Sequence, residues 1–167
     1  MSRRTTVRRA LVVLVVVSCL LAGVASAVPG GRALAVEDTR TGERLLTVPV
    51  DEGDTVSLEY THSVEKTRVL DQYTVRGDEL EMTRMEFESY GWGLPSRADV
   101  REENGTFVFD PEGSFEEIHV TPGDVAHHRL HVGDRTFDLY DRYGERSVRI
   151  ALVHRSALEA GIDRLTP

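Results

Sequence analysis

The chain has 167 residues, of which 28 are acidic and 20 basic, so its formal net charge is −8. An acidic surface repels nucleic acid, which argues against a nucleic-acid-binding function. The only cysteine is Cys19, so no internal disulfide can brace the fold, and the length is that of one ordinary domain.

The N-terminal segment has the composition of an export signal. Four arginines stand within residues 3–9 and precede an uncharged run over residues 10–28. A small-x-small cleavage site ends at Ala27, whereas the uncharged run is also just long enough to span a bilayer. We therefore expect residues 1–28 to be a signal peptide or a transmembrane anchor, followed by a linker at residues 29–32.

Lipidation is a third route for the same segment. The residues before Cys19 fit a lipobox, but the apolar run continues well beyond that cysteine, which makes this route less favoured. All three routes lead out of the cytoplasm, and we expect an extracytoplasmic protein that is membrane-anchored or secreted.

The body of the chain is more acidic than the whole. Without the four arginines of the signal, 16 basic residues (20 − 4) stand against 28 acidic ones, a balance of −12, and Lys66 is the only lysine. Such a composition is typical of salt-rich habitats, where screening weakens the self-repulsion of the compact state. We expect a halophilic archaeon as the source. An arginine-rich genome would explain the scarcity of lysine but not the acidic excess.

Short runs with a period of two follow one another after the signal and predict β-strands. These runs cover residues 33–36, 45–50, 55–64, 69–75, 80–87, 106–109, 115–120, 129–132, 136–140 and 148–153. Their regular spacing favours a single all-β domain over residues 33–167, built as an antiparallel sandwich or barrel. Ser156 and Glu159 have capping-box spacing and predict a terminal turn of helix that ends at Gly161.

The strands at 55–64 and 69–75 are expected to form a hairpin. A two-residue turn at Glu65-Lys66 would place Tyr60 opposite Asp71. A longer loop through Thr67 is the alternative, because Glu-Lys is not a favoured pair for a tight turn.

This hairpin carries the candidate chemistry. Adjacent strand residues point to opposite faces, so His62 and Ser63 are not expected to form the pair that a nucleophilic serine needs. Asp71 would lie within reach of Tyr60 and His62, which predicts a Tyr-Asp-His network. Such a network is more often structural than an acid-base pair.

Two exposed turns are candidate binding surfaces. Glu65, Lys66 and Thr67 stand at the predicted hairpin tip, where the lysine could contact an anionic ligand or a partner's carboxylate, or could simply be solvated. Trp92 stands between two glycines and could anchor a partner or fold back over the core.

No metal site and no cofactor are expected. On one strand His127 and His131 would stand roughly 13 Å apart, and His127 and His128 would point apart, so they could not chelate one ion. Asn104 begins an Asn-Gly-Thr sequon on a predicted hairpin turn and is a candidate for glycosylation.

Two segments of the chain resemble a known family. The run Tyr60-Thr61-His62-Ser63-Val64-Glu65-Lys66-Thr67, followed by the loop Gly91-Trp92-Gly93-Leu94-Pro95, is similar to the domain of unknown function family 1850. The resemblance extends over residues 34–140. It implies a compact extracytoplasmic fold and genes that often neighbour tripartite (TRAP-type) transporters, but no reaction. The chain departs from the family pattern at Val69 and Leu70, and it lacks the cysteines that many members carry within residues 128–139.

Three functions follow as hypotheses. The leading one is a non-enzymatic accessory module that docks to a TRAP-type membrane transporter or its solute receptor through the hairpin tip and the Trp92 loop. The second is a small-ligand-binding β-barrel with the Tyr-Asp-His network in its mouth. The third is a hydrolase that uses His62 and Asp71, with Ser63 or Thr67 as nucleophile.

Overall fold

The computed structural model describes residues 2–89 and 99–165 of the chain. The chain divides into two compact units, one of Met1–Arg32 with His154–Pro167 and the other of Ala33–Val153.

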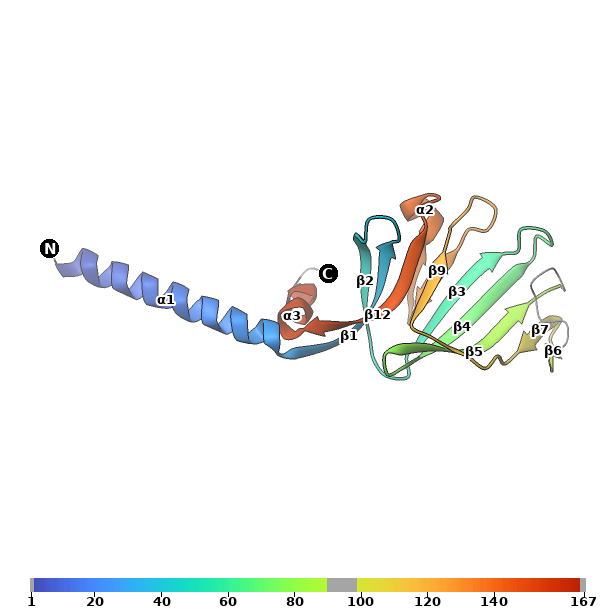
Figure 1. Cartoon of the computed structure of the whole chain (residues 1–167), viewed down its shortest axis with the longest axis horizontal. Coiled ribbons are helices and arrows are strands. Elements are labelled where there is room, and N and C mark those ends of the chain that lie inside the picture. Colours follow the sequence, from blue (N-terminus) through green and yellow to red (C-terminus); the bar gives the residue numbers. More distant parts are fainter. Residues whose placement is uncertain (1, 90–98, 166–167) are drawn as a thin grey trace. The chain divides into compact units, whose positions relative to one another are not determined.

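Two antiparallel β-sheets build the unit of residues 33–153 (Figure 1). The smaller sheet has the order β2-β1-β12-β9 and consists of β2 (Arg44–Val50), β1 (Pro29–Asp38), β12 (Val148–Ser156) and β9 (Glu117–Val120). The larger sheet has the order β11-β10-β3-β4-β5-β7-β6 and consists of β11 (Arg135–Asp138), β10 (Arg129–Val132), β3 (Thr55–Thr61), β4 (Arg68–Arg76), β5 (Glu79–Phe87), β7 (Thr106–Phe109) and β6 (Arg101–Glu103). The short β8 (Ser114–Phe115) pairs with β5, and helix α2 (Leu139–Tyr143) follows β11.

The hydrophobic core lies between the two sheets. Leu34 and Val36 of the smaller sheet and Leu58 and Val75 of the larger one belong to one buried cluster, and each is at most 6 % exposed. Leu139 of α2 joins the same cluster and is completely buried. This arrangement confirms the predicted all-β class and makes the fold a sandwich.

The hairpin of β3 and β4 has a different register from the predicted one. Tyr60 is opposite Val69, and Leu58 rather than Tyr60 is opposite Asp71, so the predicted register is wrong by two residues. The strands stop at Thr61 and Arg68, and the turn between them is longer than the two-residue turn. A slip of two residues leaves every side chain on its predicted face, so the apolar set still faces the core.

Two strand predictions need correction near the other turns. The run at 136–140 stops being a strand at Asp138, whose carboxylate Oδ1 accepts the backbone amide of Asp141 (2.9 Å) and so begins α2. The run at 115–120 divides into β8 and β9, which belong to different sheets. The Asn104-Gly105 turn is confirmed, with positive φ angles of 52° and 82° between β6 and β7.

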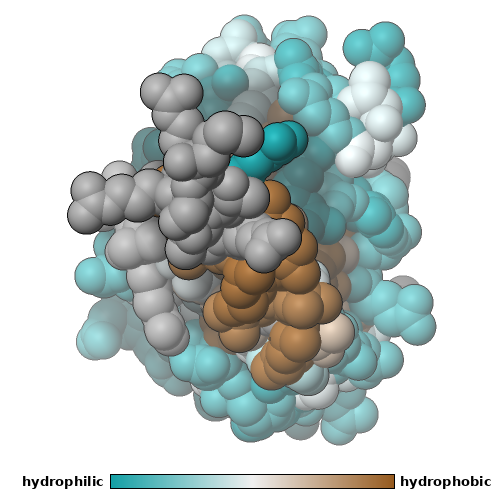
Figure 2. All heavy atoms as spheres, turned by 90° about the vertical axis from the view of Figure 1, so that its left-hand side faces the viewer, coloured by the Kyte–Doolittle hydropathy of each residue, from teal (hydrophilic) through white to brown (hydrophobic). Residues whose placement is uncertain are grey.

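The other unit contains the helices α1 (Ser2–Ala27) and α3 (Ala157–Leu165). Exposed leucine and valine side chains cover α1 and form the brown area of Figure 2. Among the described residues, no helix is both long and apolar enough to cross a membrane.

The capping box that begins α3 is confirmed. Ser156 Oγ accepts the Glu159 amide (3.2 Å), and Glu159 Oε2 accepts the Ser156 amide (2.8 Å). The helix continues past Gly161, so the predicted end at that glycine is wrong.

Candidate functional site

The turn between β3 and β4 is an ordered structure, which we call the hairpin tip (residues 62–67). The His62 amide donates to the Thr67 carbonyl (2.8 Å), and the Lys66 amide donates to the His62 carbonyl (2.9 Å). Lys66 has a φ of 58°, in the left-handed region that a lysine rarely adopts. These bonds hold the turn in one conformation.

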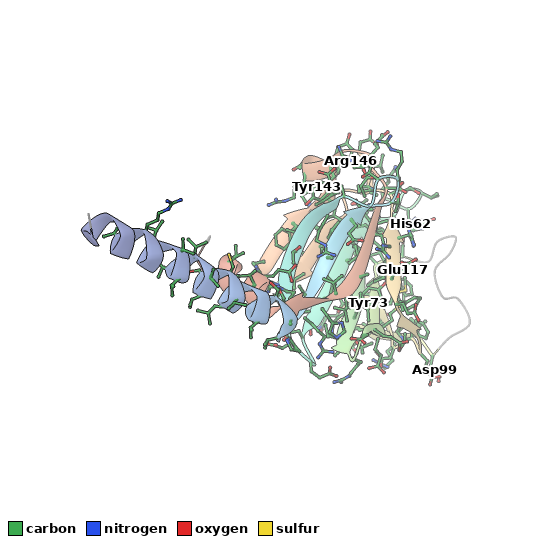
Figure 3. The ribbon with its side chains drawn as sticks, turned by 60° about the vertical axis from the view of Figure 1, so that its left-hand side comes forward. His62, Tyr73, Asp99, Glu117, Tyr143 and Arg146 are labelled. Carbon is green, nitrogen blue, oxygen red and sulfur yellow. The ribbon has the colours of Figure 1, made fainter. Side chains whose placement is uncertain are left out.

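His62 organises this turn through its ring. Its Nδ1 accepts the backbone amides of Val64 (3.4 Å) and Glu65 (3.2 Å), which requires Nδ1 to be unprotonated. Figure 3 shows His62 at the end of the sandwich that also carries Tyr143 and Arg146, with Tyr73 nearer the middle. The histidine is therefore a structural part of the hairpin tip.

The side chains outside these bonds face solvent. Ser63, Val64, Glu65 and Lys66 are all exposed, and Val64 is 65 % exposed although it is a branched aliphatic residue. Because the core does not need these side chains, their chemistry is available to a partner.

Two neighbouring segments support the base of the tip. The Thr61 amide donates to the carbonyl of Ala126 (2.7 Å), which lies in the loop before β10. Thr67 Oγ1 shares a hydrogen bond with Ser89 Oγ (3.0 Å). The tip is thus fixed on both sides by residues far from it in the sequence.

Below the tip, Tyr60 and Asp71 are hydrogen-bonded on the core side of the larger sheet. Burial raises the pKa of Asp71 to about 6, and the hydrogen bond from Tyr60 lowers it only in part. Burial and the nearby Asp71 charge raise the pKa of Tyr60, so its hydroxyl stays protonated and donates a hydrogen bond to the carboxylate. Tyr73 also lies close enough for the Asp71 charge to raise its pKa, although burial is the larger cause.

The histidine of this cluster is His128, not the predicted His62. The rings of Tyr60 and His128 are stacked with centroids 5.2 Å apart, and burial lowers the pKa of His128. Asp71 Oδ1 and His128 Nδ1 are buried and have no hydrogen-bond partner among the described residues. The sequence contains no signal for this contact, because it depends on how the loop before β10 folds back over β3.

The outer face of the larger sheet carries a row of alternating charges, the charge ladder. It runs across six strands through Asp138, Arg129, Glu59, Arg68, Glu86, Arg84 and Glu103. Glu59 stands at its centre and binds Arg68 (2.9 Å) and Arg129 (2.9 Å) with its two oxygens. Positive and negative charges alternate along the ladder, so the ladder as a whole does not attract an anion or a cation.

Part of this outer face is hollowed. A hollow of about 240 Å³ lies over β5, β6 and β7. It is lined by Arg84, Glu86, Glu103, Asn104, Thr106 and Val108. This hollow is therefore distinct from the hairpin tip and from the Tyr60–Asp71 pair.

Three predicted residues do not belong to the β3–β4 hairpin: Trp92, Asn104 and Cys19. Trp92 lies outside the described residues. Asn104 is exposed on its turn and stays a candidate for glycosylation, and Cys19 is exposed on α1 and stays a candidate for lipidation. Of the predicted network, the structure brings Tyr60 and Asp71 together, while His62 serves the tip.

Comparison with known proteins agrees with the resemblance seen in the two motifs. The family model of the domain of unknown function DUF1850 matches residues 56–139, which include the β3–β4 hairpin, β10 and the start of α2. Searches of curated proteins and of solved structures found no match. The chain belongs to the DUF1850 family.

Proposed function

We propose that this protein is a non-enzymatic docking module that binds a partner through its hairpin tip. The observation that carries the proposal is the exposed Val64 and Lys66 on a turn that six hydrogen bonds hold in place, two of them accepted by the His62 ring. A preorganised surface loses little conformational entropy on binding, which favours recognition. Neither side chain is part of the buried core.

A TRAP-type transporter or its solute receptor is the partner that we propose. The resemblance of the motifs supports this choice, since it implies genes beside such transporters. The basic N-terminus and the exposed apolar side chains of α1 support export or anchoring, which would put the tip on the outer side of the membrane. An isolated Lys66 on a chain with 28 acidic residues would pair with a carboxylate of the partner.

The test is a binding measurement with purified components. The full chain is titrated against the solute receptor and against the membrane subunits of a TRAP-type transporter from the same organism. Lys66→Asn is the informative variant, because asparagine tolerates the positive φ while it removes the ammonium. Val64→Ser removes the exposed aliphatic group.

Arg135→Asn is the matched control. It removes an exposed charge beside the β10–β11 turn, which lies at the Val56 end of β3 and thus at the opposite end from the tip. We expect both tip variants to bind at least ~10-fold more weakly than the wild type and the control to bind normally. Equal binding by all four proteins, or no binding to either component, would refute the proposal.

A small-ligand site is the second candidate. The supporting observation is that Asp71 Oδ1 and His128 Nδ1 are buried and unpartnered among the described residues, and such atoms normally find partners. A ligand with two polar groups could satisfy both. A hydrolase has less support, because His62 Nδ1 already accepts two backbone amides.

A further inference from the structure

Three potential metal ligands meet beside α2, and none of them is a residue of the hairpin tip. One ligand atom each from His127, Asp138 and Asp141 lies within 4.8 Å of the other two. His127 belongs to the loop before β10, whereas the aspartates stand at the start of α2, so two separate segments converge here. The sequence does not reveal this cluster, because His127 was expected on one strand with His131. In the structure, His127 lies in the loop before β10.

The imidazole is held in place from two directions. His127 has a φ of 43°, and its amide donates to the Gly123 carbonyl (2.9 Å). Its ring packs edge-on against Tyr140, with centroids 5.3 Å apart. A backbone in the left-handed region costs a residue with a Cβ free energy, and here it directs the ring toward the two carboxylates.

The two aspartates remain able to accept a cation. Asp138 uses Oδ1 for the Asp141 amide, and its Oδ2 lies 3.9 Å from Nε of Arg129. That arginine makes its closer contact with Glu59, at 2.9 Å. The negative charge of the pair is therefore only weakly compensated, which favours a bound divalent ion.

We propose that His127, Asp138 and Asp141 form a binding site for a divalent cation of the zinc class. One imidazole nitrogen with two carboxylate oxygens is a donor set that Zn²⁺ accepts, and a water completes the four positions. Mg²⁺ and Ca²⁺ prefer oxygen ligands alone and fit this set less well. The ion would join the loop before β10 to α2 and so brace the Ala126 carbonyl that supports the hairpin tip.

The test is a calorimetric titration of the full chain with Zn²⁺, repeated with Mg²⁺ and Ca²⁺, and a thermal melt with and without Zn²⁺. Asp141→Asn is the cleanest variant, because Asp141 is exposed and only its backbone amide takes part in the cap. His127→Asn removes the imidazole and tolerates the positive φ. His119→Asn is the control, since His119 is also an exposed histidine with a nearby acid, Glu117.

We expect one Zn²⁺ per chain, a higher melting temperature with Zn²⁺, and at least ~10-fold weaker binding in both variants but not in the control. Zn²⁺ binding that is unchanged in His127→Asn and Asp141→Asn would overturn the assignment. Loss of binding in His119→Asn alone would place the ion at Glu117 instead. The zinc titration measures the ion alone and contains no partner, so its result does not depend on whether the hairpin tip docks to a transporter.

Discussion

Tyr60 and Asp71 are hydrogen-bonded diagonally across β3 and β4, because the residue directly opposite Asp71 is Leu58. A tyrosine is long enough to span this diagonal, and an aspartate opposite a core leucine is forced toward the interior. The pair thus places a carboxylate among apolar neighbours with one hydroxyl as its partner. That environment determines how the protein responds to pH.

Asp71→Asn should change the pH dependence of stability. The folded-state pKa of about 6 lies above the ordinary value of 3.8, so between them the native state holds a proton that the unfolded chain has lost. The free energy of unfolding must then fall as the pH rises from about 4 to about 6. Asp71→Asn removes this titration. The free energy of unfolding of the variant minus that of the wild type should therefore rise by up to about 3 kcal/mol between pH 4 and pH 6.

Urea denaturation at several pH values measures this difference. Asp134→Asn, at an exposed turn, is the control and should keep the wild-type profile. If Asp71→Asn also follows the wild-type profile, Asp71 does not carry the raised pKa.

Lys66→Gly should leave the domain as stable as the wild type or up to about 1 kcal/mol more stable. The φ of 58° strains any residue with a Cβ, and glycine adopts it freely, although glycine loses more entropy on folding. Lys66→Val should be destabilising, because a β-branched side chain tolerates this φ least. Thermal melts of both variants check this, and a destabilised glycine variant would mean that the ammonium itself supports the fold.

Glu59→Gln should lower the free energy of unfolding at pH 7 by about 1–3 kcal/mol, since it removes the closest acidic partner of both Arg68 and Arg129. Burial alone would raise the pKa of Glu59, but the hydrogen bond and charge of Arg68 hold it below its ordinary value of 4.5. The stabilisation is therefore present above that pH and disappears as the pH falls through the folded-state pKa. Denaturation at pH 7 and pH 3, with the exposed Glu102→Gln as control, should show a larger difference between wild type and Glu59→Gln at pH 7 than at pH 3.

The domain should melt at a lower temperature when KCl is reduced from ~2 M to ~20 mM, because screening of like charges is lost. Its most buried acids already have arginine partners, since Glu37 binds Arg149 and Asp38 lies 3.5 Å from Arg146. Most of the other described acidic residues are exposed, where salt acts most strongly. A melting temperature that stays constant or rises on dilution would contradict the expectation of a salt-rich habitat.

Alternation of apolar and polar residues predicted most of the strands, because most of them have one face toward the core and one toward solvent, although β1 is buried on both faces from Ala33 to Asp38. It could not predict the register of β3 and β4, since the His62 ring, rather than the Glu65-Lys66 dipeptide, organises the turn. The same alternation could not predict where α2 begins. Residues 136–140 alternate like a strand, and only the cap by Asp138 ends it.

The candidate site was predictable only in part. The link between Tyr60 and Asp71 follows from their places in the hairpin and survives the change of register. The contact of Tyr60 with His128 and the cluster of His127 with Asp138 and Asp141 depend on a loop that no local pattern describes. Tertiary packing therefore decides which histidine joins which carboxylate.

The charge ladder constrains how the family can diverge. Glu59 joins two arginines from two different strands, so a mutation of this one residue removes the closest ion pair of both cations at once. A change at Arg68 would likewise disturb both Glu59 and Glu86. Substitutions along the charge ladder should therefore occur together in related sequences. Correlated replacement at positions 59, 68 and 129 would then show from sequences alone that β10, β3 and β4 are neighbouring strands.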